Sequence, residues 1–363
     1  MRVLVAMSGG VDSSVAAALL VAAGHDVTGA TLKLWGGPSD SGCCSVADVD
    51  DARRVAQQLG VAHHVFNLAD EFGRDVVAPY VAAHRAGRTP NPCIECNRTI
   101  KFDRLLARAR RLGFDQLATG HHAQVAAMPG GRWQLRRGAD GLKDQSYVLS
   151  MLGQDALAHV CFPVGHLQKP AVRAEAARLG LRTAAKPDSQ DVCFIYGREG
   201  RSGFLAQRLE LHPGVVVDEH SGETLGALDA VELVTVGQRR GIMAVTGERR
   251  YAVDVDVATR RVTVATAARA RVDEAILEPG SVTWVDEALD DGAAAFAQVS
   301  AHGRPARCTV HLGGAAGAAG AVRCCFEEPQ RPVAPGQTLA LYDARDPGAV
   351  VGAGIVAGSR RVA

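Results

Sequence analysis

One short run limits what this chain can fold into: residues 8–14 read Ser-Gly-Gly-Val-Asp-Ser-Ser. An apolar segment, residues 3–7, precedes it, and an alanine-rich segment, residues 15–20, follows it. This order predicts a strand, a loop and the start of a helix. Glycines let the backbone approach a ligand closely, and the free N–H groups and positive dipole end of a helix attract anions. We therefore expect an anion site where the strand passes into the helix.

The run lacks the Gly-Lys-Ser/Thr ending of the common P-loop, whose lysine reaches the outer phosphates. It resembles instead the pyrophosphate-binding loop of ATP pyrophosphatases, which cleave ATP between its α and β phosphates. The alternative is an ordinary glycine turn in an α/β protein. Three serines and an aspartate around two glycines are an unusually polar way to make such a turn, so the sequence favours the nucleotide loop.

The first half of the chain alternates short apolar segments with helical ones. Further strands are expected at residues 27–34, 61–68 and 116–120, and helices at 45–60, 70–84 and 102–112. Strands separated by helices predict a parallel, doubly wound sheet. Ligands of such sheets bind at the carboxyl ends of the strands. Ser8 and Gly120 both follow a predicted strand, so we expect them at one edge of the sheet.

The pattern changes after about residue 200 to short β-rich runs with turn signals, at residues 215–217, 251–255, 261–264, 295–299, 308–312, 322–326 and 338–342. These runs predict a small β domain followed by a β-barrel. The expected domains are residues 1–200, 201–270 and 271–363. A glycine–alanine run at residues 313–320 is expected to be the tip of a hairpin.

Charge and hydropathy limit which partners the chain can bind and how. With a net charge of +1 the chain has no global positive field, so a nucleic acid would have to meet local patches. Candidate basic residues are Arg104, Arg108, Arg110, Arg111, Arg136, Arg137 and Lys143, although the first four also fit a solvated helix face. We find no leader-like segment and no apolar stretch approaching the ~18 residues of a membrane span. We therefore expect a cytoplasmic protein with no membrane partner.

The nine cysteines are then expected to be catalytic, metal-binding or inert rather than held in structural disulfides. Two of them lie in the run Thr-Pro-Asn-Pro-Cys-Ile-Glu-Cys-Asn, residues 89–97, which predicts a rigid turn. We expect Cys96 just ahead of a helix that starts near Lys101, where the helix end and nearby cations would lower its pKa. The Cys-x-x-Cys pair fits half of a zinc site, a redox pair, or a nucleophile with a bystander. Zinc would need a second pair, and neither Cys43-Cys44 nor His121-His122 is a good candidate.

Four more blocks stand out: residues 120–123 with two histidines, 143–147, 186–194 with Cys193, and 236–241. Alone, Cys193 is as well explained as a buried thiol at the start of a strand. Taken in order, however, the six blocks resemble those of the tRNA-specific 2-thiouridylases, and a C-terminal β-barrel of that family fits the remainder of the chain. The phosphate loop is shared with other ATP pyrophosphatases, whereas the blocks around Cys96 and Cys193 are far more specific.

The resemblance implies an adenine nucleotide α-hydrolase-like catalytic domain that binds ATP, with Mg²⁺ neutralising the phosphates. The matching ATP positions are Ala6, Met7, Ser8, Gly9, Gly10, Val11, Asp12, Ser13, Leu32 and Gly120. The implied substrate is the wobble uridine of tRNA, flipped out of the anticodon. The positions that match tRNA contacts are Asn91, Pro92, Cys93, His121, Lys143, Asp144, Gln145 and Gln337.

The implied reaction is that of a tRNA-uridine 2-sulfurtransferase. ATP adenylates the uracil O2 and releases pyrophosphate. Cys193 matches the residue that carries a persulfide received from a cysteine desulfurase or a carrier protein, and Cys96 matches the nucleophile. The two would end as a transient disulfide, which a cytoplasm allows. The other six cysteines apart from Cys93 are expected to be inert buried thiols.

Two departures from the family bear on this mechanism. Many members carry an aspartate where this chain has Cys93, and a basic–tyrosine tRNA contact is replaced at residues 301–304, where Arg304 alone keeps the charge. With Cys93 present, the three thiols of Cys93, Cys96 and Cys193 could instead hold an iron–sulfur cluster that delivers the sulfur. Two further alternatives are an ATP pyrophosphatase acting on a small molecule and a non-catalytic RNA-binding protein. Pyrophosphate release that depends on tRNA would exclude both.

Overall fold

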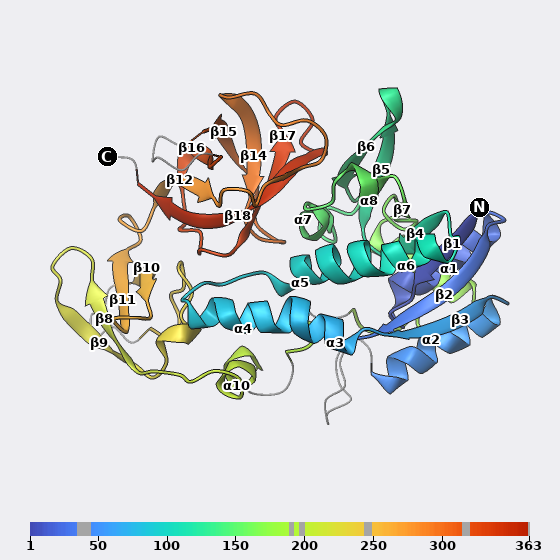
Figure 1. The fold of residues 1–363 in the computed structure, drawn as a ribbon, viewed down its shortest axis with the longest axis horizontal. Coiled ribbons are helices and arrows are strands. Elements are labelled where there is room, and N and C mark those ends of the chain that lie inside the picture. Colours follow the sequence, from blue (N-terminus) through green and yellow to red (C-terminus); the bar gives the residue numbers. More distant parts are fainter. Residues whose placement is uncertain (35–44, 189–191, 196–199, 243–248, 314–319, 362–363) are drawn as a thin grey trace.

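The computed structural model describes residues 1–34, 45–188, 192–195, 200–242, 249–313 and 320–361. A parallel α/β unit, a small β unit and a β-barrel follow one another along the chain, coloured blue to green, yellow, and orange to red in Figure 1. The predicted fold class is confirmed. Cys43, Cys44, residues 189–191 of the Cys193 block and residues 314–319 of the glycine–alanine run lie outside the described residues.

The α/β unit is built on five parallel strands in the order β3-β2-β1-β4-β7. They are β1 (Arg2–Ala6), β2 (Asp26–Lys33), β3 (Ala62–Asn67), β4 (Gln116–Thr119) and β7 (Val160–Cys161). Because side chains alternate along a strand, Leu4 faces one core while Val3 and Val5 face another. Helices α1 (Val11–Ala22), α2 (Val46–Gln58) and α9 (Lys169–Arg178) cover the second face, so the sheet is doubly wound.

Two composite helices cover the first face. One joins α3 (Ala69–Phe72), the π-helical η1 (Gly73–Val77) and α4 (Ala78–Arg85), close to the predicted helix at 70–84. The other joins α5 (Pro92–Glu95), the π-helical η2 (Cys96–Leu105) and α6 (Leu106–Arg111). Figure 1 shows α4 reaching from the parallel sheet toward the small β unit, beneath the barrel.

The second composite helix corrects a prediction. It starts at Pro92, not near Lys101, because the Asn91 side chain accepts hydrogen bonds from the amides of Cys93 (3.0 Å) and Ile94 (3.4 Å). An N-capping asparagine followed by proline at the first helical position is a strong start signal. Cys93 therefore lies in the first turn and Cys96 one turn further on, so the prediction that Cys96 precedes the helix was wrong.

The remaining elements of the α/β unit are the hairpin of β5 (Ala123–Met128) and β6 (Arg132–Arg137) with the short η3 (Pro129–Gly131), and the short helices α7 (Ser146–Leu149) and α8 (Gln154–Leu157). Helix α10 (Gly200–Ala206) follows at the start of the next unit and is drawn below α4 in Figure 1. The small β unit has strands β8 (Gly214–Asp218), β9 (Thr224–Leu228), β10 (Arg250–Asp256) and β11 (Arg261–Thr266), with η4 (Val231–Leu233). Its order is β10-β11-β8-β9.

Six strands of the C-terminal unit form a closed barrel in the order β12-β16-β15-β14-β17-β18, and β12 pairs with both β16 and β18. They are β12 (Val272–Leu277), β14 (Ala293–Gln298), β15 (Ala306–Leu312), β16 (Val322–Gln330), β17 (Thr338–Asp343) and β18 (Val350–Arg360), and β13 (Thr283–Trp284) adds to β18. The sequence did not predict β18, because its glycines weaken the strand signal. They are needed for packing, since a Cβ at Gly352 would lie 2.7 Å from the Trp284 ring.

Arginines of β6 join the α/β unit to the barrel. Arg136 forms an ion pair with Asp346 (2.6 Å). Arg137 donates to Asp144 (2.6 Å) and Gln298 (2.8 Å), and its guanidinium lies 3.7 Å from the Tyr342 ring centroid. Both arginines were candidates for phosphate contacts. In this structure each of them binds a residue of the barrel, and Arg137 also binds Asp144 of the α/β unit. None of the described helices is long and apolar enough to span a membrane.

A buried histidine at the contact of α4 with the small β unit makes folding sensitive to acid. Burial, with Arg201 nearby, lowers the pKa of His84 to about 4. An unfolded histidine titrates near 6.5, so stability is full above that pH and falls as the pH drops from 6.5 to 4, by up to about 3 kcal/mol. Urea unfolding of His84→Gln should lack this component. An unchanged difference in stability between pH 7 and pH 4.5 would contradict the assignment.

Candidate active site

A pocket of about 700 Å³ opens at the carboxyl ends of β1, β2 and β4. Of the ten predicted ATP positions, all but Gly9 line it: Ala6, Met7, Ser8, Gly10, Val11, Asp12, Ser13, Leu32 and Gly120. Gly10 is the N-cap of α1 and has no side chain that could occupy the first-turn amides. The loop and the helix end therefore form one wall of a polar pocket suited to an anion.

Two glycines are required by close backbone contacts. Gly9 has a positive φ of 74°, and a Cβ there would lie 2.3 Å from the carbonyl oxygen of Asp48 in α2. A Cβ at Gly120 would lie 2.5 Å from the amide nitrogen of Ser13. The back of the loop is thus pressed against α2 while its front faces the pocket. Lys186 fixes this arrangement, since its Nζ binds the Gly9 carbonyl (2.9 Å), Asp48 (2.6 Å) and Asp51 (2.7 Å).

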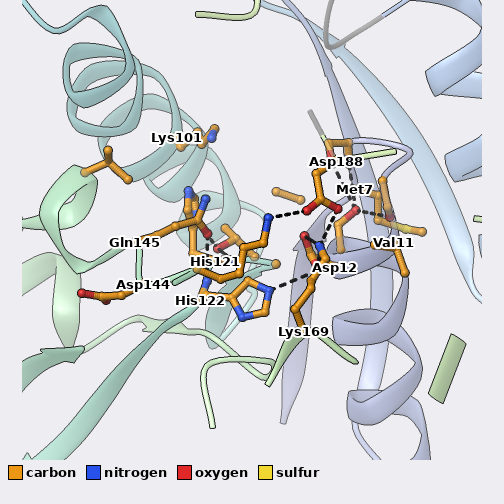
Figure 2. A pocket seen from close by; sticks show the side chains of 18 of the residues that line it. Met7, Val11, Asp12, Lys101, His121, His122, Asp144, Gln145, Lys169 and Asp188 are labelled. Atoms are coloured by element: carbon orange, nitrogen blue, oxygen red, sulfur yellow. Dashed lines mark hydrogen bonds and ion pairs between the residues drawn. The ribbon is translucent and has the colours of Figure 1, made fainter. Parts of the chain in front are cut away.

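Asp12 is the charged centre of the loop. Both of its carboxylate oxygens lie 2.7 Å from Nζ of Lys169, and Oδ1 lies 3.2 Å from Nε2 of His122 (Figure 2). Burial alone would raise the pKa of Asp12, but the hydrogen bonds from His122 and Lys169 outweigh it and lower this pKa. Asp12 is therefore an ionised carboxylate beside the predicted phosphate site.

The opposite wall carries four of the predicted tRNA positions, His121, Lys143, Asp144 and Gln145. His121 is buried, its Nδ1 lies 2.6 Å from the hydroxyl of Thr119, and burial, with Lys101 nearby, lowers its pKa well below the ordinary value. It is therefore a neutral imidazole. The Asp144 carboxylate binds Arg137 and the amides of Gly138 and Ser146, so in this structure it supports the wall from behind.

The pocket wall also contains residues outside the predicted sets of ATP and tRNA positions: Thr31, Lys101, His122, Lys169, Asp188, Ala301 and His302. Ala301 and His302 come from the loop after β14, so the barrel reaches the pocket. Gln298 holds this loop, donating to the carbonyls of Ser300 (2.9 Å) and Ala301 (3.2 Å). The departure from the family pattern at residues 301–304 therefore falls on a pocket-lining loop.

The helix with Cys93 and Cys96 runs beside the pocket rather than into it. Asn97, next to Cys96, donates to the carbonyl of Val148 (3.0 Å), and Val148 lines the pocket together with Lys101 of the same helix. Cys96 is buried, whereas Cys93 and Cys193 are partly exposed.

The Cys193 segment is brought to the same helices by aromatic packing. Phe194 lies edge-on to Tyr80 (5.8 Å between ring centroids) and to Phe72 (5.4 Å). Burial raises the pKa of Tyr80, and Cys93 adds to that rise because its thiol lies near the same ring. Tyr80 is thus a common neighbour of Cys93 and of the residue that follows Cys193, so the structure brings the two cysteine blocks together.

Gln337, a predicted tRNA contact, binds the segment before the thiol-bearing helix. Its amide donates to the carbonyl of Thr89 (2.6 Å), while the Thr89 amide donates to the carbonyl of Pro335 (2.8 Å). The Thr89 hydroxyl bonds Thr235 of the small β unit (3.3 Å). A Cβ at Gly336 would lie 3.3 Å from backbone atoms of Thr89 and Pro90. Both other domains therefore hold the backbone just before the Asn91 cap and the two thiols.

This contact predicts a defined effect of Gln337→Ala. Losing the bond to Thr89 should speed amide hydrogen exchange about fivefold in residues 89–96 of the RNA-free protein, as expected for one neutral hydrogen bond. Turnover should fall about tenfold while the Kd for tRNA stays unchanged. Gln330→Ala is the matched control, since among the described residues the side chain of that barrel glutamine bonds the nearby Glu328 carbonyl and no other domain. A weaker tRNA affinity with unchanged exchange would show that Gln337 acts through RNA.

Family comparisons agree with this architecture. Three family models match in order: a tRNA methyl transferase HUP domain over residues 1–197, a tRNA methyl transferase PRC-barrel domain over 202–266, and an aminomethyltransferase beta-barrel domain over 275–356. The tRNA-specific 2-thiouridylase MnmA of Streptomyces avermitilis is 43% identical over 374 residues, covering 100% of this chain and 96% of that protein. The protein of the same name from Mycolicibacterium paratuberculosis is 45% identical over 373 residues, covering 99% and 100%.

The chain belongs to the tRNA-specific 2-thiouridylase family. The resemblance seen in the sequence is confirmed, and it extends over the whole chain. Among solved structures, the U34-tRNA thiolase NcsA from Methanococcus maripaludis with its [4Fe-4S] cluster is similar at a TM-score of 0.36 and 19% identity, covering 57% of this chain and 65% of that one. A 4-thiouridine synthetase–RNA complex with bound ATP gives 0.34 and 16%, covering 53% and 44%. At these TM-scores the likeness does not extend to function.

Within the 2-thiouridylase family, the nucleotide loop, the two cysteine blocks and the barrel of this chain are all present and assembled around one pocket. The curated relatives are named thiouridylases, whereas two of the family models are described as tRNA methyl transferase domains. Both names concern tRNA, but one implies transfer of sulfur and the other transfer of a methyl group. The residues of the site favour one of these two reactions, as argued below.

Proposed function

We propose that this protein is an ATP-dependent tRNA-uridine 2-sulfurtransferase that acts on the wobble uridine. The observation that carries the proposal is the position of the cysteine-bearing helix along the wall of the loop-lined pocket. A phosphate loop and thiols are the groups that activation by ATP and sulfur transfer require. Methyl transfer from an electrophilic donor requires neither a pyrophosphate-releasing loop nor a sulfur carrier.

The proposed reaction has two stages. The uracil O2 attacks the α-phosphate of ATP, and pyrophosphate leaves from the loop at residues 8–13. The terminal sulfur of a persulfide on Cys193 then attacks C2, and AMP leaves with the O2 oxygen. Attack of the Cys96 thiolate on Sγ of Cys193 forms a disulfide and leaves the sulfur on C2 as 2-thiouridine. An external thiol reductant must then reduce the disulfide before another turnover.

ATP requires charge neutralisation, and the carboxylate of Asp12 fits a role in holding Mg²⁺. Mg²⁺ is commonly held by one or two carboxylates together with substrate phosphates. When bound it would withdraw charge from the phosphates. Lys169 and His122 hold the Asp12 carboxylate at the pocket wall, and neutral His121 can exchange a hydrogen bond with the substrate without taking up a proton.

A cluster mechanism is the second candidate, and Cys93 is the observation that favours it, because cysteine is a usual iron–sulfur ligand and aspartate is not. Among the described residues, however, no group of three or more His, Cys, Asp or Glu side chains is arranged to hold a metal ion. These thiols as placed do not fit a cluster, and we derive no step through one.

The proposed function extends to the domain limits, the sulfur donor and the cellular location. We place the domain limits at residues 1–200, 201–270 and 271–363, supported by the gaps between the family matches. The sulfur donor would be a cysteine desulfurase or a carrier that hands on a persulfide. A disulfide that must be reduced in each turnover fits a reducing, cytoplasmic location.

The test is nucleoside mass spectrometry of unmodified tRNA incubated with the protein, ATP, Mg²⁺ and a persulfide-generating desulfurase. The proposal expects 2-thiouridine together with AMP and pyrophosphate in equal amounts, all three dependent on tRNA. Signal only after anaerobic iron–sulfur reconstitution would favour the cluster mechanism. Pyrophosphate release without tRNA, or methylated uridine when a methyl donor is supplied, would overturn the proposal.

A further inference from the structure

Three cations converge on one carboxylate at the rim of the pocket. The Asp188 oxygens lie 2.7 Å from Nζ of Lys143, 2.8 Å from Nζ of Lys169 and 2.6 Å from the guanidinium of Arg173. Figure 2 shows Asp188 beside Asp12, with Lys169 bound to Asp12. The side chain of Lys169 is only 9% exposed, so a nearly buried positive charge is directed at these two acids.

The Asp188 carboxylate and its two lysine partners lie in the predicted nucleotide pocket. Lys143, Lys169 and Asp188 line the same cavity as the loop at residues 8–13, and Lys169 connects Asp188 directly to Asp12 of that loop. In the pocket two lysines face two carboxylates, so each ammonium has an anionic partner there. A terminal phosphate offers three oxygens and about two negative charges, and it satisfies several converging N–H donors better than a carboxylate does.

Arg173 has a different role from the two lysines. It does not line the pocket, and it also donates to the carbonyls of Ala184 (2.8 Å) and Lys186 (3.0 Å). Arg173 therefore holds the backbone of the segment that precedes Asp188. The lysines make no such backbone contacts through Nζ among the described residues, so their donors can be transferred to another acceptor.

The use of lysine here is itself selective. Only five of the chain's 40 Lys and Arg residues are lysines, and three of them, Lys101, Lys143 and Lys169, line this pocket. Lysine is a compact point charge with freely rotating donors, whereas arginine presents a rigid planar fork. The lysines of a chain otherwise rich in arginine are therefore concentrated at this pocket.

We infer that Lys169, together with Lys143, which the family resemblance assigned to tRNA, forms the site for the outer phosphates of ATP, and that Asp188 competes with phosphate for these two lysines. The identity of the nucleotide rests on the proposed function. ATP must displace the Asp188 carboxylate from the two lysines, so Asp188 competes with the nucleotide. Burial alone would raise the pKa of Asp188, but the hydrogen bonds from Lys143 and Lys169 hold it well below the usual range.

The test is calorimetric titration of the full chain, without tRNA, with ATP, pyrophosphate and AMP. Asp188→Asn should bind ATP and pyrophosphate about fivefold more tightly, because a partly exposed ion pair no longer competes, and should bind AMP as before. Lys143→Met should bind ATP and pyrophosphate about tenfold more weakly, with AMP again unchanged. Glu175→Gln is the matched control, because it also removes one negative charge. In the part of the chain that the structure describes, Glu175 of α9 forms its ion pair with Arg178 (2.6 Å), and neither residue lines the pocket.

Weaker ATP binding by Asp188→Asn would overturn the inference, since it would make Asp188 a ligand of the nucleotide or its metal. An equal gain for AMP, or the same gain in Glu175→Gln, would also overturn it by showing a general charge effect. The pyrophosphate titration separates this inference from the proposed function. A protein that binds pyrophosphate as expected but forms no 2-thiouridine contradicts the function alone.

Discussion

Replacing Cys193 with serine is expected to abolish 2-thiouridine formation, by about 10³-fold or more, while the Kd for ATP stays within twofold of the wild type. Serine cannot carry a persulfide, whereas Cys193 is separated from the loop and does not line the ATP pocket. Cys96→Ser should lose turnover to the same extent for a different reason, because the sulfur attached to C2 can no longer be released. Single-turnover mass spectrometry of the tRNA should then find it covalently bound to Cys193.

Cys161→Ser is the matched control, because this half-buried thiol is at the end of β7 and burial raises its pKa to about 12. It should thiolate normally. Cys93→Asp restores the residue type that many family members carry, and it distinguishes the two sulfur mechanisms. Full activity of Cys93→Asp without iron would exclude Cys93 as a required ligand, whereas normal thiolation by Cys193→Ser would contradict the persulfide relay.

The second large effect is expected at Lys169. Lys169→Met should lower the rate of tRNA-dependent pyrophosphate release by about 10²- to 10³-fold, the usual cost of removing one donor that stabilises developing charge. The side chain is nearly buried and binds both Asp12 and Asp188, so solvent cannot replace its charge. Quench-flow measurement of pyrophosphate separates this step from sulfur transfer.

Lys169→Arg tests whether charge alone is enough. Its planar fork cannot reproduce a single ammonium that binds two carboxylates, so we expect less than one tenth of the wild-type rate. The thermal unfolding temperature of both variants should be recorded, because Asp12 and Asp188 would repel each other in Lys169→Met, where the positive charge between them is lost. A normal pyrophosphate rate in folded Lys169→Met would show that the loop at residues 8–13 acts without this lysine.

The sequence was most informative where a local pattern has one structural meaning. The run at residues 8–14 predicted the strand, loop and helix because glycine and small polar residues at that junction leave few alternatives. The helix predicted from residue 45 begins there, where Ser45 and Asp48 form a capping box. The helix start at Pro92 was missed although its signal, Asn91 followed by Pro92, was present. The pattern of prolines was interpreted as a turn, and the π-helical stretch that follows has no sequence signature of its own.

The candidate site was only partly predictable because its remaining members come from distant segments. Asp188 and Lys169 meet Asp12 across more than 150 residues of chain, and Gln298 acts only by holding a loop of the barrel. No local spacing reports such contacts. The scarcity of lysine would have been a usable signal, since four of the five lysines, all but Lys33, bind or line the nucleotide loop or its pocket.

Thr89 limits how far the three domains can be treated as interchangeable modules. Its amide and carbonyl are bonded to the barrel and its hydroxyl to the small β unit, two residues before the cap of the thiol-bearing helix. A chimera that takes its barrel from a relative would leave these groups facing an unmatched loop unless residues 86–91 were exchanged together with residues 335–337. A substitution at Gly336 or Gln337 therefore alters the support of a segment in another domain, and any engineered combination has to match the two segments.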